Sequence, residues 1–224
     1  MIVSSVIFDL DGTLIDCVED ISTIINTMRV DRGLTPLDSS LYRKEISYGA
    51  VNLLNVAFKK KVINSALIQD FRSRYSKKHI KKTSIYPGVI ETLSKLKSMG
   101  IKRAICTNKP DFLCDNALID TGLAKYFDVV VANNGILNSK PHPEMLDLVL
   151  RKLGGKYGTV IMVGDSTVDQ KISAKVGIPF VFFSAGYNDG VLEEQAYSCI
   201  EHIQDLLTLP FLQNPIINKI KETQ

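Results

Sequence analysis

An unbroken run of apolar residues lies close to the start of the chain. Val6, Ile7 and Phe8 follow one another without polar residues between them, which is typical of a strand buried on both faces. Asp9 and Asp11 come directly after this run. Open α/β sheets bind ligands at the carboxyl ends of strands, and side chains two residues apart on an extended chain face the same way. Because neighbouring carboxylates repel each other unless a cation or a shared proton intervenes, this stretch predicts a site of chemistry.

The apolar pattern changes to helical spacing between residues 16 and 85. Val18, Ile21 and Ile25 recur at intervals of three and four, which predicts a helix ending near Gly33. We expect three more helices, one beginning near residue 39 and two covering 51–58 and 66–80. Nothing in this stretch predicts a strand, so we expect a small all-helical insertion.

Strands and helices alternate in the rest of the chain. The expected strands cover 102–106, 128–132, 159–163 and 179–183, with helical patterns between them. Such alternation implies right-handed crossovers and a parallel sheet covered by helices on both faces. The last stretch, 210–224, has no clear place in this scheme, and we expect a surface extension, either a short helix or a dimer contact.

We therefore expect an α/β fold of two parts. Residues 1–15 and 86–224 are predicted to form a core with a Rossmann-like, doubly wound parallel sheet, and residues 16–85 a helical cap domain inserted after the first strand. The sequence leaves open whether the protein is a monomer or a homodimer.

The composition is that of a globular protein. Hydrophobic residues make up 45% and charged residues 23% of the 224 residues. We find neither a signal-peptide pattern nor an apolar run long enough to span a membrane, so we expect a cytoplasmic protein without membrane contact. The four cysteines show no metal-binding spacing, which favours reduced thiols.

Positive charge is concentrated in the predicted insertion. Residues 16–85 contain 13 Lys+Arg and 7 Asp+Glu, a balance of +6, whereas the remainder contains 14 and 17, a balance of −3. Most of these lysines and arginines are expected on solvated helix faces, and the excess also suits attraction of a small anionic substrate. The total of +3 does not indicate a nucleic-acid partner.

Polar side chains follow the expected strands in four places. These are Asp9 with Asp11, Thr107 with Asn108, Lys140 in its loop, and Asp165 with Asp169. In a parallel sheet the carboxyl ends of the strands share one edge, so these clusters are expected to converge. Carboxylates suit Mg²⁺, while a hydroxyl, backbone N–H groups and a lysine suit the oxygens of a phosphoryl group.

The same clusters resemble the four motifs of the haloacid dehalogenase superfamily. The resemblance includes the Asp-x-Asp-Gly-Thr sequence from Asp9 to Thr13, and the helical insertion is similar to a cap of that superfamily. The segments 107–110, 139–143 and 186–188, together with 46–54 of the insertion, most resemble phosphoglycolate phosphatases. One departure is Ser47, which stands where that subgroup is expected to have glycine.

The resemblance implies catalytic and metal-binding roles. Asp9 is the expected nucleophile, which becomes phosphorylated, and Asp11 the expected general acid and base. Mg²⁺ is expected on the side chains of Asp9 and Asp165 and on the backbone carbonyl of Asp11.

Other residues are implied to bind phosphate or to support the site. Thr107, the Asn108 backbone and Lys140 are expected to hold phosphoryl oxygens. Asp169 is expected to orient Lys140 or a metal-bound water, and Thr13 to hydrogen-bond Asp11 or its loop.

These interpretations leave several functions open. The leading one is a Mg²⁺-dependent phosphatase acting on a small phosphate monoester, with 2-phosphoglycolate the leading substrate. A phosphosugar mutase resembling β-phosphoglucomutase, a pyrophosphatase or a nucleotidase would use the same core, although the mutase motif usually lacks the threonine found at Thr13. A phospho-aspartate receiver domain is the non-enzymatic alternative, and the insertion argues against it. Arg43 and Lys44 are candidates for binding a substrate carboxylate, with solvated surface charge as the competing interpretation.

Overall fold

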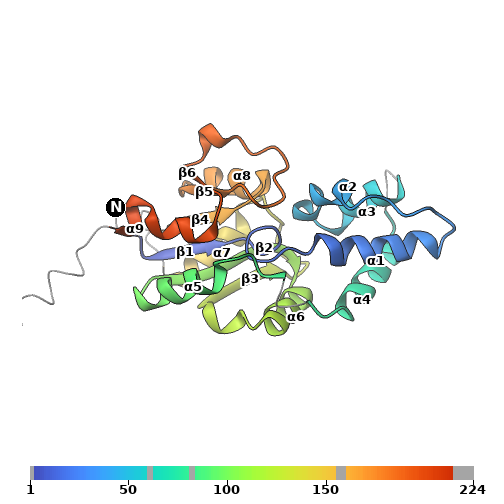
Figure 1. The fold of residues 1–224 in the computed structure, drawn as a ribbon, viewed down its shortest axis with the longest axis horizontal. Helices are drawn as coiled ribbons and strands as arrows, with labels where there is room; N and C mark the ends of the chain where they lie inside the picture. Colours follow the sequence, from blue (N-terminus) through green and yellow to red (C-terminus); the bar gives the residue numbers. More distant parts are fainter. Residues whose placement is uncertain (1–2, 60–62, 81–83, 155–159, 214–224) are drawn as a thin grey trace, which may run out of the picture.

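The computed structural model describes residues 3–59, 63–80, 84–154 and 160–213, and a six-stranded parallel sheet lies at its centre. The strands lie in the order β3-β2-β1-β4-β5-β6 (Figure 1). Their bounds are Ser5–Phe8 (β1), Lys102–Pro110 (β2), Val129–Asn133 (β3), Val160–Gly164 (β4), Phe180–Phe183 (β5) and Ser198–Ile200 (β6). This order confirms the predicted doubly wound α/β sheet, since the chain first moves outward from β1 in one direction and then in the other.

Two apolar layers enclose the sheet. Helices α5 (Val89–Ser98) and α6 (Asp111–Thr121) pack on one face, and α7 (Glu144–Leu153) and α8 (Thr167–Val176) on the other. Successive residues of each strand point into different layers: Phe8 belongs to the first and Ile7 to the second. Both faces of β1 are therefore buried, which explains its unbroken apolar run.

The strand β6 at the sheet edge was not predicted. It has only three residues, and Ser198 and Cys199 are not buried. A strand this short, at an edge, lacks the apolar run by which the other strands are recognised.

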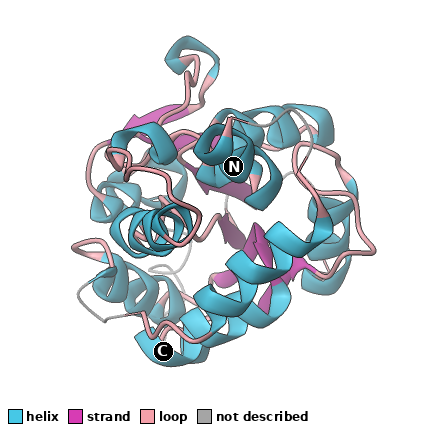
Figure 2. Cartoon of the chain, turned by 90° about the vertical axis from the view of Figure 1, so that its right-hand side faces the viewer, coloured by secondary structure: helices cyan, strands magenta, loops and turns pink. Residues whose placement is uncertain are grey.

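Helices fill the predicted insertion. They are α1 (Val18–Val30), α2 (Ser40–Arg43), α3 (Ala50–Phe58) and α4 (Ser65–Ser76), with a short 3₁₀ helix, η1 (Ile46–Tyr48), between α2 and α3. Figure 1 shows them gathered beside the sheet, and Figure 2 looks at them from the opposite side to the core, with strands visible behind the helices.

Two adjacent chain segments join these helices to the sheet. Ile15 pairs antiparallel with Ile85, and the Asp16 N–H donates to the Ser84 carbonyl at 2.7 Å. The chain thus enters and leaves the helical region at one place. We propose, on this contact, the division into a core of residues 1–15 and 86–224 and a cap of residues 16–85.

The predicted terminal extension begins with the short helix α9 (Pro210–Gln213), in which Phe211 and Leu212 are buried. The Phe211 ring lies 5.2 Å from that of Tyr197, so this part packs against the core. Residues 214–224 lie outside the described part of the chain. Among the described helices, none has the length and apolar character needed to cross a membrane.

Candidate active site

A tight turn follows β1 and carries the first motif. Gly12 has a φ of 86°, and its N–H donates to the Ile15 carbonyl at 2.8 Å. A Cβ atom at Gly12 would lie 2.3 Å from Asp165 Oδ2, and one at Gly186 would lie 2.3 Å from the Gly12 carbonyl oxygen. Both positions therefore need glycine, because the three loops approach each other around Asp165.

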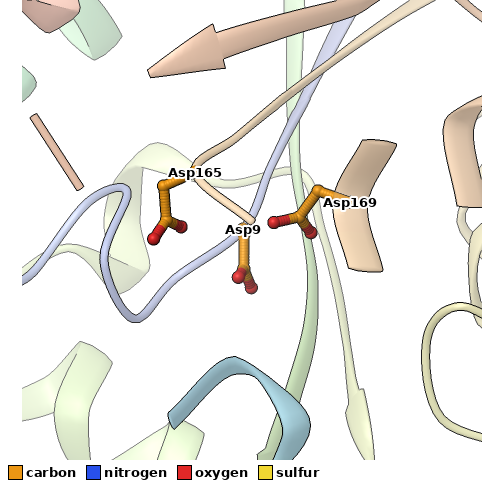
Figure 3. A group of neighbouring side chains, drawn as sticks. All are labelled: Asp9, Asp165 and Asp169. Atoms are coloured by element: carbon orange, nitrogen blue, oxygen red, sulfur yellow. The ribbon is translucent and has the colours of Figure 1, made fainter. Parts of the chain in front are cut away.

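Three buried carboxylates meet at the carboxyl edge of the sheet (Figure 3). Asp9 follows β1, Asp165 follows β4, and Asp169 lies in the first turn of α8. One oxygen from each lies within 4.8 Å of the others, and the three side chains belong to residues no more than 3% exposed. The sequence prediction that these segments converge is therefore correct.

Lys140 lies between two of these carboxylates. Its Nζ donates to Asp169 Oδ1 at 2.6 Å and lies 2.9 Å from Asp9 Oδ1. The second contact has the distance of an ion pair but not the alignment of a hydrogen bond, so Asp9 Oδ1 has no hydrogen-bond donor among the described residues. Asp9 is thus held near a cation with one buried oxygen left unsatisfied.

Burial, together with the neighbouring charges, shifts the pKa values of the cluster. Burial, opposed by Lys140 and reinforced by Asp169, raises the pKa of Asp9 to about 7. Burial and the charges of Asp169 and Asp9 raise the pKa of Asp165 well above its ordinary value. Burial alone would lower the pKa of Lys140, but Asp169 and Asp9 raise it instead. Three carboxylates face one ammonium, and a cation would relieve this imbalance.

Other segments orient two of the carboxylates. Asp165 accepts hydrogen bonds from Thr13 Oγ1 and from the Tyr187 N–H, both at 2.8 Å. The Thr13 hydroxyl thus binds Asp165 and not Asp11, because Gly12 brings the turn directly against Asp165. The Thr13 N–H donates within the loop, as expected, to the Leu10 carbonyl at 3.3 Å. Asp169 accepts from Ser166 Oγ at 2.6 Å in a capping box that begins α8, and its other oxygen accepts from Lys140, as predicted.

The donor set fits Mg²⁺. All candidate ligands are carboxylate oxygens, which this ion prefers together with water and a phosphate oxygen. Asp9 Oδ1, which accepts no hydrogen bond among the described residues and is paired only with Lys140, is a candidate ligand atom. Among the described residues the acidic cluster comprises Asp9, Asp165 and Asp169. The Asp11 carboxylate is bound by Lys109 instead, so the expected metal ligand of Asp11 is its backbone carbonyl.

The Asp11 carboxylate is bound by a residue to which sequence reasoning gave no role. Lys109 Nζ donates to both oxygens of Asp11 at 3.0 Å and to the Tyr75 hydroxyl of α4 at 2.8 Å. The ammonium also lies 4.4 Å from the centre of the Tyr75 ring. Burial alone would lower the pKa of Lys109, but Asp11 raises it. Lys109 therefore links the core carboxylate to the helical insertion.

Thr107 and Asn108 extend the same strand end. Asn108 Oδ1 accepts from the Lys140 N–H at 2.8 Å, and its Nδ2 donates to the carbonyls of Lys140 and Ser47. Asn108 thus fixes the backbone that carries Lys140 and contacts the insertion. Thr107 Oγ1 accepts from the Lys109 N–H at 3.2 Å. All three predicted phosphate-binding residues are buried at the carboxyl edge of the sheet.

A cavity of about 40 Å³ lies on the Asp11 side of the site. One wall consists mostly of apolar side chains from α1, α3 and α4, together with Arg72, and the other includes Asp11, Asn108 and Lys109. The volume accommodates about three or four water-sized groups. A small leaving group would fit between the insertion and the core.

Two further contacts hold the insertion against the core. Arg43 donates to the Gly186 carbonyl at 2.9 Å and lies over the Tyr187 ring at 5.4 Å. The Tyr48 hydroxyl lies 2.8 Å from Thr167 Oγ1. Arg43 is half-buried, and its guanidinium binds backbone carbonyl groups of the core loop.

Sequence reasoning missed Lys109, Tyr187 and Tyr75. Lys109 directly follows Thr107 and Asn108, which are both predicted to bind phosphate, and this position is a usable signal. Tyr187 and Tyr75 offered no comparable signal, because their contacts depend on how distant segments dock.

Comparisons with known proteins agree with this geometry. A family model of haloacid dehalogenase-like hydrolases matches residues 6–183. A phosphoglycolate phosphatase of Rhodobacter capsulatus is 32% identical over 212 residues, covering 92% of this chain and 94% of its own length. Another, from Mesorhizobium japonicum, is 31% identical over 218 residues, covering 94% and 96%.

A solved structure shares the whole fold. The crystal structure of a predicted phosphoglycolate phosphatase from Haemophilus somnus has a TM-score of 0.82 and 26% identity, and the match covers 92% of this chain and 97% of that one. The family match spans the β1 turn, the Lys140 loop and the Asp165 segment, which together build the buried cluster. The chain therefore belongs to the haloacid dehalogenase-like hydrolases, and it is a phosphatase of that family.

Proposed function

We propose that this phosphatase hydrolyses 2-phosphoglycolate in a Mg²⁺-dependent reaction through an aspartyl-phosphate intermediate. The observation that carries the proposal is the division of the first motif. Asp9 lies in the acidic cluster beside Lys140, whereas Asp11 lies at the cavity and is held by Lys109. The two carboxylates therefore face different parts of a substrate.

Asp9 is the nucleophile. Its Oδ atom attacks the phosphorus atom, a P–O bond forms, and the bond from phosphorus to the ester oxygen breaks on the opposite side. Lys140, which is buried 2.9 Å from Asp9 Oδ1, is suited to attract the phosphoryl oxygens, and Thr107 and the Asn108 N–H supply further donors nearby. Bound Mg²⁺, held by Asp9, Asp165 and the Asp11 carbonyl, supplies positive charge that offsets the charge of the phosphoryl group.

Asp11 acts as the general acid and then as the general base. It gives a proton to the leaving alkoxide as the ester bond breaks, and it later takes one from the water that attacks the aspartyl phosphate. Hydrolysis then returns Asp9 as a carboxylate and releases inorganic phosphate. Lys109 and Tyr75 fix the direction of the Asp11 side chain, so they act as positioning residues.

Three observations support 2-phosphoglycolate as the substrate. Curated relatives that align over nearly their full length are phosphoglycolate phosphatases. The cavity beside Asp11 is small, about 40 Å³, which favours a small leaving group. The insertion carries the excess of positive charge, which favours an anionic metabolite.

The test is a panel of phosphate esters with the purified protein. The panel contains 2-phosphoglycolate, β-glucose 1-phosphate, a nucleoside monophosphate and pyrophosphate, each assayed by phosphate release with and without Mg²⁺. We expect the highest kcat/KM for phosphoglycolate and none without the metal. A higher kcat/KM for any of the other three would replace phosphoglycolate as the proposed substrate.

The intermediate is tested separately. Rapid denaturation during turnover of ³²P-labelled substrate is expected to trap label on the protein, in a bond that hydroxylamine cleaves. The D9N variant is expected to trap none, and equal labelling of D9N would assign the nucleophile elsewhere.

A further inference from the structure

Among the described residues, one half-buried arginine at the cavity has a shielded donor without a hydrogen-bond partner. Arg72 of α4 lines the cavity that reaches Asp11. Its Nε atom is shielded from solvent and has no hydrogen-bond partner within the described ranges 3–59, 63–80, 84–154 and 160–213. A donor on a charged group that is removed from water without a partner is costly, so this position favours an anion.

The other cations around the site are already satisfied. Lys140 contacts Asp9 and Asp169, and Lys109 contacts Asp11 and Tyr75. Arg43 binds backbone carbonyl groups. Of the basic residues described at this face, Arg72 is therefore the one with binding capacity left at the cavity.

The cavity sets where an anion would lie. Asp11, which is proposed to protonate the leaving oxygen, lines the same small space as Arg72. The space holds about three or four water-sized groups, and apolar side chains such as Leu53 and Phe71 form much of its remaining wall. A group bound by Arg72 is thus only a few atoms from the ester oxygen.

We propose that Arg72 binds the carboxylate of the substrate and selects phosphorylated small acids over uncharged phosphate esters. A guanidinium group offers parallel N–H donors that match a carboxylate, and surrounding apolar walls strengthen the pairing. This inference rests on the proposed function and deepens it, because the leaving group of 2-phosphoglycolate is glycolate, whose carboxylate is one carbon from the ester oxygen.

The experiment compares two substrates of similar size in R72M and in the wild type. Phosphoglycolate carries the carboxylate, and ethyl phosphate does not. We expect R72M to lower the ratio of kcat/KM for phosphoglycolate to that for ethyl phosphate by about 10- to 100-fold. R72K is expected to recover part of the ratio, since lysine keeps the charge but not the planar pair of donors.

Lys77→Met is the matched control. It removes one positive charge from the exposed end of the same helix and is expected to leave the ratio unchanged. Thermal unfolding shows whether R72M is folded. Because Arg72 Nε has no described partner, the R72M melting temperature is expected to stay close to that of the wild type.

The outcomes separate the two proposals. A folded R72M with an unchanged ratio, or with equal losses on both substrates, would overturn the assignment of Arg72 while leaving phosphoglycolate as the substrate. A wild type that hydrolyses other phosphate esters but not phosphoglycolate would overturn the proposed substrate, and the Arg72 assignment with it.

Discussion

The acidic cluster and the contact between the insertion and the core differ in how their polar groups are connected. In the acidic cluster, Asp9, Asp165 and Asp169 are buried around Lys140 and are held by short contacts within the core. At the contact, separate polar pairs join different segments, as Tyr75 with Lys109 and Arg43 with Gly186. In the cluster, the fixed carboxylates have an excess of negative charge that a bound cation would balance. At the contact, each hydrogen bond contributes little free energy, so it can be broken and re-formed. We propose that the acidic cluster carries the chemistry and that the contact governs access and selectivity.

The largest effect is expected from D9N. Replacing the nucleophile by an amide of the same shape is expected to lower kcat by about 10⁴-fold or more, because an amide cannot form the intermediate. Steady-state phosphate release measures the loss. D38N changes an exposed aspartate and is the control, with wild-type activity expected. Residual turnover of D9N above one tenth of the wild type would contradict the division of roles.

Removal of the metal is expected to abolish activity as well. EDTA should stop phosphate release, and Mg²⁺ should restore it and raise the melting temperature of the protein, because a ligand that binds only the folded state stabilises it. D165N should lose most of that thermal shift, since it removes a buried ligand. K109M, which changes the contact and not the cluster, should keep it. If Mg²⁺ raised the melting temperature of D165N as much as that of the wild type, the metal would bind outside this cluster.

A smaller loss is expected where the two regions meet. K109M removes the group that holds both oxygens of Asp11, and we expect kcat to fall by about 10- to 100-fold, at the lower end of what proton-transfer groups contribute. Y75F keeps the ring and removes only the hydroxyl, so its loss should be several-fold smaller. If Y75F were as impaired as K109M, the hydroxyl rather than the lysine would position Asp11.

Breaking a contact remote from Asp11 should have a weaker effect. R43A removes the hydrogen bond to Gly186, and we expect KM for phosphoglycolate to rise by up to about tenfold with kcat less affected. R32A removes an ion pair to Asp70 within the insertion and serves as the control, with no change in KM expected. Equal effects of R43A and R32A would show that the contact with the core has no special part in binding.

The smallest expected effect is on the pH dependence of stability in EDTA. The pKa of Asp9 is raised from 3.8 to about 7 in the folded protein, so between these values the folded state binds a proton that the unfolded chain releases. The contribution of Asp9 to stability is therefore present at low pH and is lost as the pH rises towards 7. The difference in melting temperature, D9N minus wild type, should increase by a few degrees as the pH is raised from 4.5 to 7.5. A constant difference would show that Asp9 keeps an ordinary pKa.

The sequence predicts the acidic cluster much better than the contact. Long apolar runs identify β1 and β4, and their carboxyl ends share one edge of a parallel sheet, so Asp9 and Asp165 converge as a matter of topology. The loop after β3 brings Lys140 to the same edge. The sequence does not predict β6, because its three residues, of which two are not buried, show no comparable apolar run.

The contact depends on how the insertion docks against the core, and the hydrophobic periodicity of the sequence contains no information about this docking. The sequence pattern indicates no role for Lys109, and only the structure shows it between Asp11 and Tyr75. Thr13 was assigned to the wrong aspartate for a related reason. The bond to Asp165 follows from the close approach that Gly12 and Gly186 allow, over 152 residues of sequence.

The antiparallel pairing of Ile15 with Ile85 has an evolutionary consequence. Since the chain leaves the core and returns to it side by side, with Asp16 bonded to Ser84 at 2.7 Å, this junction places no constraint on the length of the segment between them. Insertions, deletions or a complete exchange of the intervening segment would leave the nucleophile and its cation site intact. Descendants of such a gene are therefore free to acquire new substrates by altering residues such as Arg72, without inventing the hydrolytic chemistry again.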